Sequence, residues 1–264
     1  MDSVPSPIYT SAFYPVRMYE ADPEGRATII SLINYFQEAA ALHARILGFH
    51  PDNLKKFGIG WVLSRLCLQV ERYPLAEEKV RVITWLLPPR HRTAFRDFQL
   101  EDAQGHTIAR CTSAWPVMDL TTRRMTDLPE ALLRLIPQKF PQALEFPSRT
   151  IAKLTVPLYS ASITPRFSDL DFNHHVNNVH FVAWALEALP HDFRRTHTLS
   201  RLDIIFRSEI TQSTSITTAC APSQDAPLTW QHSLTRASDL TETARLTTVW
   251  SDKETILPAK PNHV

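Results

Sequence analysis

The chain has 264 residues, of which 44% are hydrophobic and 21% charged, so it can bury one large core or two of ordinary size. Its 28 Lys and Arg residues nearly balance 27 Asp and Glu residues, which leaves no overall basic field for nucleic acid. Among the 5 glycines, only Gly58 and Gly60 lie close together. This excludes the glycine-rich loops of dinucleotide enzymes and P-loop NTPases, and the nucleophile elbow of hydrolases.

The cysteines and the ends of the chain bear on its location. Cys67, Cys111 and Cys220 are isolated and odd in number, which favours a reducing compartment over a disulfide framework. No Cys or His pair has zinc spacing, so we expect neither a metal nor another cofactor. The first residues lack a basic segment followed by an apolar run, and no stretch of about 18 apolar residues occurs. We expect a cytoplasmic chain with no membrane partner.

The predicted elements begin with a strand over 13–19 and a helix over 28–47, whose apolar residues recur at helical spacing. β-Branched and aromatic residues predict four further strands, at 59–72, 79–87, 93–102 and 107–118. Prolines within 137–150 break helices and remove ladder hydrogen bonds, which predicts a linker. A second helix, over 177–189, is apolar on nearly every side and should be largely enclosed.

The second half of the chain repeats the first. A shift of 149 positions places Asp22 on Asp171, and a shift of 136 places residues 64–66 on residues 200–202, both of which read Ser-Arg-Leu. The order of the matches persists along both halves, and the change of shift falls in the loop after the helix, where length differences are tolerated. Each half is therefore expected to hold a short strand, a helix and then several strands.

A mostly antiparallel sheet that curls round one buried helix is a hot dog fold. The sequence thus predicts the α+β class with two such units in tandem. The predicted domains are an N-terminal unit over 8–136, a linker over 137–150 and a C-terminal unit over 151–258. Pairing the two units edge to edge hides exposed strand edges. We therefore expect an intramolecular pseudo-dimer, and a further homodimer is left open.

The two halves differ in polar residues near the start of the second helix. The second half carries Asp171, Asn173 and His175, and its Glu209 aligns with Tyr73 at the 136 shift. Such asymmetry is expected where one duplicated half retains chemistry and the other supplies pocket and packing. The alternative interpretation is structural, because Asp and Asn before a helix are ordinary N-caps and a lone Glu on a strand is usually solvated.

Residues 166–187, RFSDLDFNHHVNNVHFVAWALE, resemble the signature of the plant and bacterial acyl-acyl carrier protein (ACP) thioesterases. The resemblance extends in order along nearly the whole chain, to residues 17–22, 32–38, 72–74, 95–98 and 122–124. It implies a double hot dog fold and hydrolysis of the thioester that joins a fatty acyl chain to ACP.

The resemblance assigns catalysis to Asp171, Asn173, His175 and Glu209, with Glu209 on the strand after the helix. Plant members carry a cysteine directly after that glutamate, whereas this chain has Ile210. A covalent acyl-cysteine route at this position is therefore excluded. The transit extension of the plant members has no counterpart in this sequence, from which a bacterial cytoplasmic enzyme is expected.

Thioester hydrolysis needs an activated water and groups that stabilise charge on the carbonyl oxygen. We hypothesise that the helix start near Val176, with the Asn173 amide or His175, polarises the carbonyl. Glu209 is expected to act as general base towards water, while His175 orients it or protonates the leaving thiolate. Asp171 would fix the imidazole or the helix start, and these roles can be permuted without contradicting the sequence.

An apolar tunnel for the acyl chain is expected along the first helix, bounded by Leu32, Tyr35, Phe36 and Trp61. Because ACP is strongly acidic, basic residues are expected round the entrance. The candidates are Arg90, His91, Arg92, Arg123, Arg124, Arg194 and Arg195. Two alternative functions stay open: a hot dog thioesterase acting on coenzyme A (CoA) thioesters, and a module that binds acyl thioesters without cleaving them.

Overall fold

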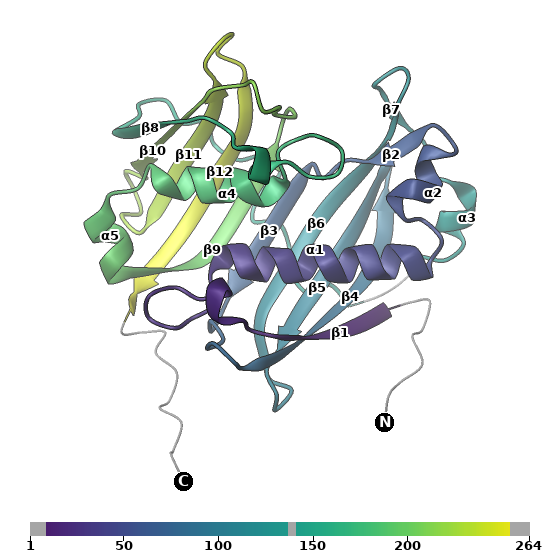
Figure 1. The fold of residues 1–264 in the computed structure, drawn as a ribbon, viewed down its shortest axis with the longest axis horizontal. Helices are drawn as coiled ribbons and strands as arrows, with labels where there is room; N and C mark the ends of the chain where they lie inside the picture. The colour runs from purple at the N-terminus through teal and green to yellow at the C-terminus, as the bar shows by residue number, and fades with distance from the viewer. Residues whose placement is uncertain (1–8, 137–140, 254–264) are drawn as a thin grey trace. The chain divides into compact units, whose positions relative to one another are not determined.

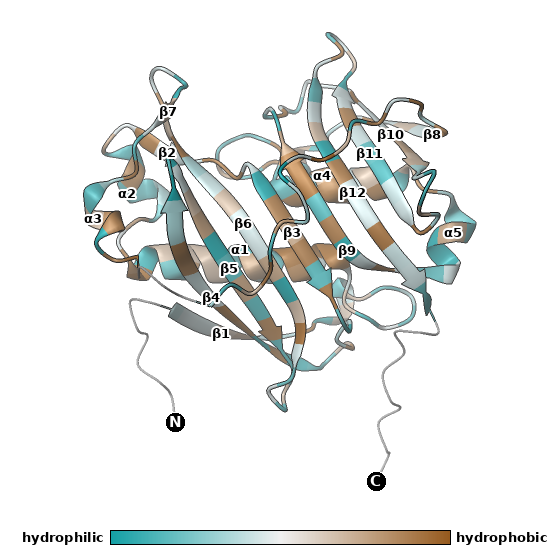
Figure 2. Ribbon diagram, turned by 180° about the vertical axis from the view of Figure 1, so that it is seen from behind, coloured by the Kyte–Doolittle hydropathy of each residue, from teal (hydrophilic) through white to brown (hydrophobic). Residues whose placement is uncertain are grey.

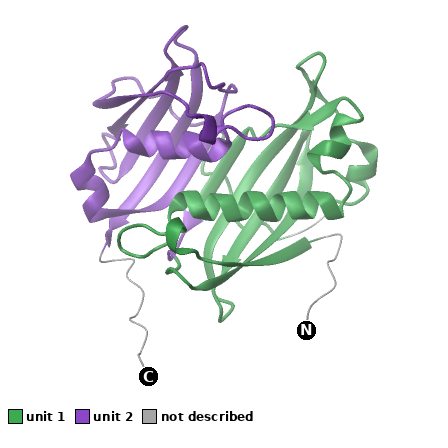
Figure 3. Ribbon diagram, viewed as in Figure 1, with its two compact units in different colours: residues 1–68, 74–149 green, residues 69–73, 150–264 purple. Residues whose placement is uncertain are grey.

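The structure is a computed structural model that describes residues 9–136 and 141–253. The chain forms two compact units, one of residues 1–68 and 74–149 and the other of residues 69–73 and 150–264 (Figure 3). Residue 8, residues 137–140 and residues 254–258, which belong to the predicted domains and linker, lie outside the described residues. The predicted domain boundaries stay predictions.

The first unit contains one long helix and an antiparallel sheet in the order β1-β4-β5-β6-β3, with β2 and β7 each paired to β6. Its strands are β1 (Tyr9–Pro15), β2 (Ile59–Trp61), β3 (Arg65–Val70), β4 (Lys79–Arg90), β5 (Thr93–Glu101), β6 (Thr107–Asp119) and β7 (Met125–Thr126). Its helices are η1 (Met18–Glu20), α1 (Ile29–Ile46), α2 (Pro51–Lys55) and α3 (Glu130–Leu133).

The second unit has the same plan with fewer elements, and its sheet runs in the order β9-β12-β11-β10-β8. Its strands are β8 (Tyr159–Ile163), β9 (His197–Phe206), β10 (Ile216–Pro222), β11 (Thr229–Arg236) and β12 (Glu242–Asp252). Its helices are η2 (Phe167–Asp169), α4 (Asn178–Glu187) and α5 (His191–Thr196). In each unit the long helix lies against one face of the sheet (Figure 1), which is the predicted hot dog arrangement.

Both long helices are specified by local sequence. The Thr28 side chain accepts a hydrogen bond from the Ser31 N–H at the start of α1, and Asn177 caps α4 through the Val179 N–H. Helix α1 buries a stripe of side chains towards its sheet, whereas α4 is buried on most sides, as predicted. Along the strands, hydrophobic and hydrophilic residues alternate, as Figure 2 shows from the side opposite the helices.

The predicted repeat recurs in the hydrogen bonds of the two units. The Trp115 indole N–H donates to the Ser113 hydroxyl over 2.7 Å, and the Trp250 indole N–H donates to the Thr248 hydroxyl over 2.8 Å. These pairs occupy corresponding places on β6 and β12, offset by 135 positions in the sequence. The two units therefore share this side-chain hydrogen bond as well as the order of their elements.

Among the predicted strands, two differ most from the structure in their bounds. The strand expected at 13–19 ends at Pro15, because the backbone N–H and side chain of Arg17 both bond the Glu20 carboxylate and wind this segment into η1. The strand expected at 59–72 is divided into β2 and β3 by an irregular stretch at Val62–Ser64. Among the described residues, none of the helices is sufficiently long and apolar to traverse a bilayer.

Candidate active site

The loop between η2 and α4 is organised by one carboxylate. Asp171 Oδ1 accepts the backbone N–H of Asn173 over 2.8 Å and that of His175 over 3.3 Å. The Asp171 N–H donates to the His175 carbonyl over 2.8 Å, which closes the loop. His174 completes the turn with a left-handed backbone, at a φ of 62°. These bonds hold His175 at the end of the loop, shortly before α4 begins.

A second set of backbone bonds joins this loop to the segment that carries Glu209. Val176 donates its N–H to the Ile210 carbonyl over 2.8 Å and also bridges to Leu170. His175 directly precedes Val176 in the chain, and Glu209 directly precedes Ile210. Their side chains meet, with His175 Nε2 3.5 Å from Glu209 Oε2. Both side chains are about one-third exposed, at 33% and 38%, so water can reach the pair.

The placement of Glu209 differs from the sequence prediction, which put it on a strand. Strand β9 ends at Phe206, and Glu209 lies in the loop that follows. The Arg207 and Ser208 N–H groups both donate to the Thr243 carbonyl, which takes this backbone out of the regular ladder. The loop backbone is thus held in place by its neighbours, and the Glu209 side chain extends from it towards His175.

The start of helix α4 also differs from the prediction, which placed it near Val176. The Val176 N–H is already bonded to Ile210, and the helix begins at Asn178 with Asn177 as its N-cap. The Asn177 side chain accepts the Val179 N–H over 3.1 Å. Within the described part of the chain, the Asn178 N–H has no acceptor, so this donor remains available to a ligand.

The fourth predicted catalytic residue, Asn173, is exposed on the same loop, and its backbone N–H is bonded to Asp171. In the first turn of α4, His180 Nδ1 lies 3.9 Å from Asp169 Oδ1. Burial lowers the pKa of His180, and the nearby Asp169 charge opposes that shift. A mostly neutral His180 is therefore expected beside the loop at pH 7.

The predicted acyl-binding residues fall into two groups in the first unit. Leu32 and Phe36 are almost fully buried on the inner face of α1, and Phe36 packs on Phe98 with ring centroids 5.1 Å apart. Tyr35 is buried with its hydroxyl bonded to Glu20. Trp61 packs instead against a separate cluster of buried residues. That cluster consists of Leu47, Leu86, Ala94, Val117, Leu128, Leu132 and Ile136.

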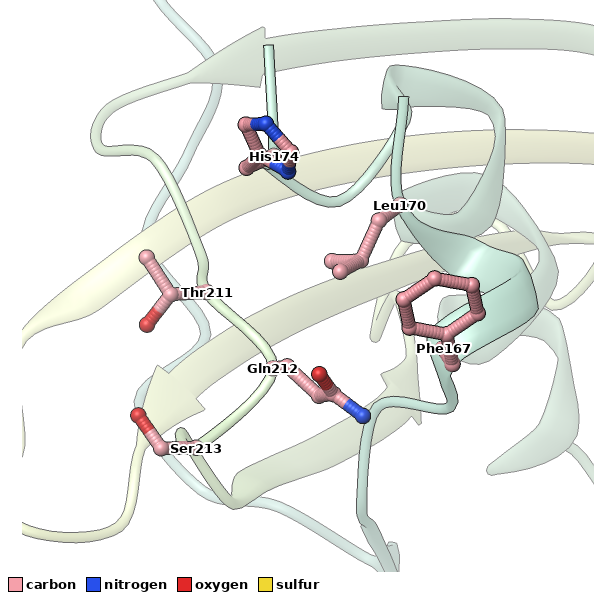
Figure 4. A pocket seen from close by; sticks show the side chains of 6 residues that line it. All are labelled: Phe167, Leu170, His174, Thr211, Gln212 and Ser213. Atoms are coloured by element: carbon pink, nitrogen blue, oxygen red, sulfur yellow. The ribbon is translucent and has the colours of Figure 1, made fainter. Parts of the chain in front are cut away.

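A pocket of about 510 Å³ lies in the second unit, and two of its lining residues, His174 and Thr211, are close in sequence to His175 and Glu209. Figure 4 shows residues from two loops around it, one before α4 and one after Glu209. The lining residues are Phe167, Leu170, His174, Thr211, Gln212 and Ser213. The sequence analysis missed this pocket. The one available signal was Phe167, an aromatic residue within the family signature that proves to be 79% exposed.

Comparison with known proteins decides the family. The model of the acyl-ACP thioesterase N-terminal domain matches residues 8–136, and that of the acyl-ACP thioesterase C-terminal domain matches residues 156–252. The chain belongs to the acyl-ACP thioesterase family. A curated relative, the chloroplastic dodecanoyl-[acyl-carrier-protein] hydrolase of Umbellularia californica, is 31% identical to this acyl-ACP thioesterase over 271 residues, or 94% of this chain and 71% of the relative.

Solved structures agree with this assignment. The 12:0-ACP thioesterase from Umbellularia californica matches this acyl-ACP thioesterase with a TM-score of 0.84 and 27% identity, over 93% of this chain and 98% of the other. An acyl-ACP thioesterase from Bacteroides thetaiotaomicron has the same fold, with a TM-score of 0.83 at 23% identity over 92% of this chain and 98% of the other. The predicted tandem hot dog fold and the predicted family are both confirmed.

Proposed function

We propose that this acyl-ACP thioesterase hydrolyses fatty acyl-ACP to a free fatty acid and ACP by direct attack of water on the thioester. The observation that carries the proposal is the contact of His175 Nε2 with Glu209 Oε2 at 3.5 Å, beside a pocket. In the first half of the sequence repeat the corresponding positions hold Arg26 and Tyr73, which cannot form an imidazole–carboxylate pair. The chemistry is therefore assigned to the second unit.

The proposed reaction uses the two side chains in sequence. Glu209 accepts a proton from a water as the water oxygen bonds to the carbonyl carbon. Glu209 passes this proton to His175, which it contacts. The tetrahedral intermediate then expels the thiolate as the carbon–sulfur bond breaks, and His175 gives the proton to the sulfur, which leaves both side chains as they began. Because the two side chains are in contact and partly exposed, one water can lie within hydrogen-bonding reach of both.

The negative charge on the carbonyl oxygen needs donors that are already in place. The Asn178 N–H at the start of α4 is one candidate donor, and the Asn173 side-chain amide is a second. The helix dipole favours negative charge at the same end. Loss of one such donor typically lowers the rate by about 100- to 1000-fold.

A covalent cysteine route has no support in this unit. Ile210 occupies the position after Glu209 and is 1% exposed. Cys220 lies on β10, where burial raises its pKa to about 12, so it remains a thiol. Asp171 is proposed to position the loop, because its carboxylate bonds the backbone of Asn173 and His175.

We assign the acyl chain to the inner face of α1, where Leu32 and Phe36 lie, and recognition of ACP to basic residues of the first unit. The pairing of Thr93 with Pro116 brings the β4–β5 turn and the β6–β7 loop to the same end of the sheet. These two loops carry Arg90, His91, Arg92, Arg123 and Arg124. Because ACP is acidic, its negative charge is complementary to the basic residues at this end of the sheet. Further dimerisation and a cytoplasmic location stay predictions.

The test compares one acyl group carried on ACP and on CoA, with release of free acid followed by mass spectrometry. We expect kcat/KM to be at least about tenfold higher for ACP, a difference worth about 1.4 kcal/mol of transition-state binding. Equal or faster cleavage of acyl-CoA would favour the alternative thioesterase. Binding of both substrates without release of acid would favour a binding module. A trapped acyl adduct on the protein would refute direct attack by water.

A further inference from the structure

The pocket beside the His175–Glu209 pair has two walls of different character. Phe167 of η2 and Leu170 form an apolar wall. On the opposite loop the Gln212 side-chain amide extends towards Phe167, while the side chains of Thr211 and Ser213 are turned away from that wall (Figure 4). Within the described residues, the Gln212 amide and the Ser213 hydroxyl have no side-chain hydrogen-bond partner. A ligand with both apolar and amide-like parts would satisfy both walls.

The walls of the pocket are close to the reacting centre. His174 directly precedes His175, and Thr211 follows Glu209 by two residues, so these lining residues lie within about 7 Å of the pair along the backbone. A volume of about 510 Å³ is ordinary for a small-molecule site. Whatever occupies the pocket is therefore joined to, or adjacent to, the thioester.

We infer that this pocket binds the pantetheine arm through which ACP presents the acyl thioester. The inference rests on the proposed function. The arm has amides that match the Gln212 side-chain amide, and a pair of methyl groups that match Phe167 and Leu170. With the arm in this pocket, its sulfur end reaches His175 while its other end leads out to the carrier protein.

Two variants probe the two walls of the pocket, and both positions are exposed, so folding should be preserved. Phe167→Ala removes the aromatic ring, and Gln212→Ala removes the amide. The matched controls are Phe57→Ala, at a phenylalanine 77% exposed in the first unit, and Gln104→Ala, at an exposed glutamine in the β5–β6 turn. Thermal unfolding of each variant verifies that stability is unchanged.

The readout compares one acyl group on N-acetylcysteamine, which carries only the sulfur end of the arm, on pantetheine and on ACP. We expect the Phe167 and Gln212 variants to lower kcat/KM for acyl-pantetheine and acyl-ACP by about five- to tenfold. The same variants should leave acyl-N-acetylcysteamine unchanged, and the control variants should leave all three substrates unchanged.

Other outcomes would overturn the inference. Equal losses on all three substrates would show that the two residues shape the catalytic loop, and no loss on any substrate would show that the arm lies elsewhere. Neither outcome bears on the proposed function, which fails only if the wild-type enzyme does not release acid from acyl-ACP. The substrate series thus separates the two claims.

Discussion

Replacing Glu209 by glutamine is the sharpest test of the proposed chemistry. The substitution keeps the shape of the side chain but removes the carboxylate that lies 3.5 Å from His175 Nε2. Glutamine cannot accept a proton from water, so the general base is lost while the loop is preserved. The bonds that hold this loop come from the backbone of residues 207, 208 and 210, and the substitution leaves them intact.

The expected loss follows from the role assigned to the side chain. General base catalysis contributes about 100- to 10,000-fold, so kcat for acyl-ACP should fall by that factor in Glu209→Gln. Because Glu209 is 38% exposed, its replacement should change the free energy of unfolding by no more than about 0.5 kcal/mol. Single-turnover release of the fatty acid measures the chemical step, and thermal unfolding measures stability.

The matched control is Glu187→Gln, since Glu187 is an exposed α4 glutamate that pairs with Arg194 away from the loop. It should retain wild-type kcat. His175→Ala combined with Glu209→Gln should lose little more than either single variant, because both residues serve one step. A Glu209→Gln enzyme with kcat within tenfold of wild type would refute the assignment of Glu209 as the base.

Two further predictions concern stability and substrate choice. His232 is buried, with its ring bonded to the Ala185 carbonyl and the Thr248 hydroxyl, and burial lowers its pKa to about 4. As the pH falls, His232 therefore takes up its proton at a higher pH in the unfolded chain than in the folded chain. The free energy of unfolding should be highest above pH 6.5 and should fall by about 3 kcal/mol towards pH 4. Urea unfolding should show that loss, and an unchanged pH slope in His232→Gln would contradict it. For substrate choice, Leu32→Phe enlarges a fully buried side chain one helical turn from Phe36. The fatty acids that the variant releases should therefore have shorter chains. An unchanged chain-length profile would show that Leu32 does not contact the acyl chain.

Local signals explain why much of the fold could be predicted from the sequence. The apolar spacing of α1 and α4 and the residues that cap them depend on neighbours within a few positions, so both helices were found within two residues of their observed ends. The repeat was also visible, because Arg65 and Leu66 on β3 recur as Arg201 and Leu202 on the corresponding strand β9. Signals of this kind do not require knowledge of tertiary contacts.

Tertiary bonds explain what the sequence could not show. Glu209 follows the apolar run of β9 without a glycine or proline to end the strand, and two N–H groups converging on the Thr243 carbonyl end it instead. The pocket combines Phe167 with residues more than 40 positions later in the chain, so no short motif encodes it. The contact between His175 and Glu209 depends likewise on the bond from Val176 to Ile210.

Comparison of the two units identifies which features of the site belong to the fold. In the first unit, Asp22 Oδ1 accepts the N–H groups of Glu24 over 3.0 Å and of Arg26 over 2.9 Å. Its own N–H donates to the Arg26 carbonyl over 2.7 Å, which is the same loop that Asp171 forms around His175. The Asp171 bonds therefore do not by themselves indicate catalysis, since the duplicated aspartate forms them without an imidazole.

The chemical difference lies at two positions, one on that shared loop and one on the segment that follows β3 or β9. Arg26 in the first unit is 7% exposed. Tyr73, which aligns with Glu209 in the sequence but lies in the second compact unit, is buried and donates its hydroxyl to the Leu199 carbonyl. The side chains of Arg26 and Tyr73 are thus buried by packing against their neighbours. In the second unit His175 and Glu209 stand at the corresponding positions, face each other and reach solvent. Since the aspartate bonds are common to both loops, the chemical difference lies in the side chains at these two positions and in their exposure to solvent.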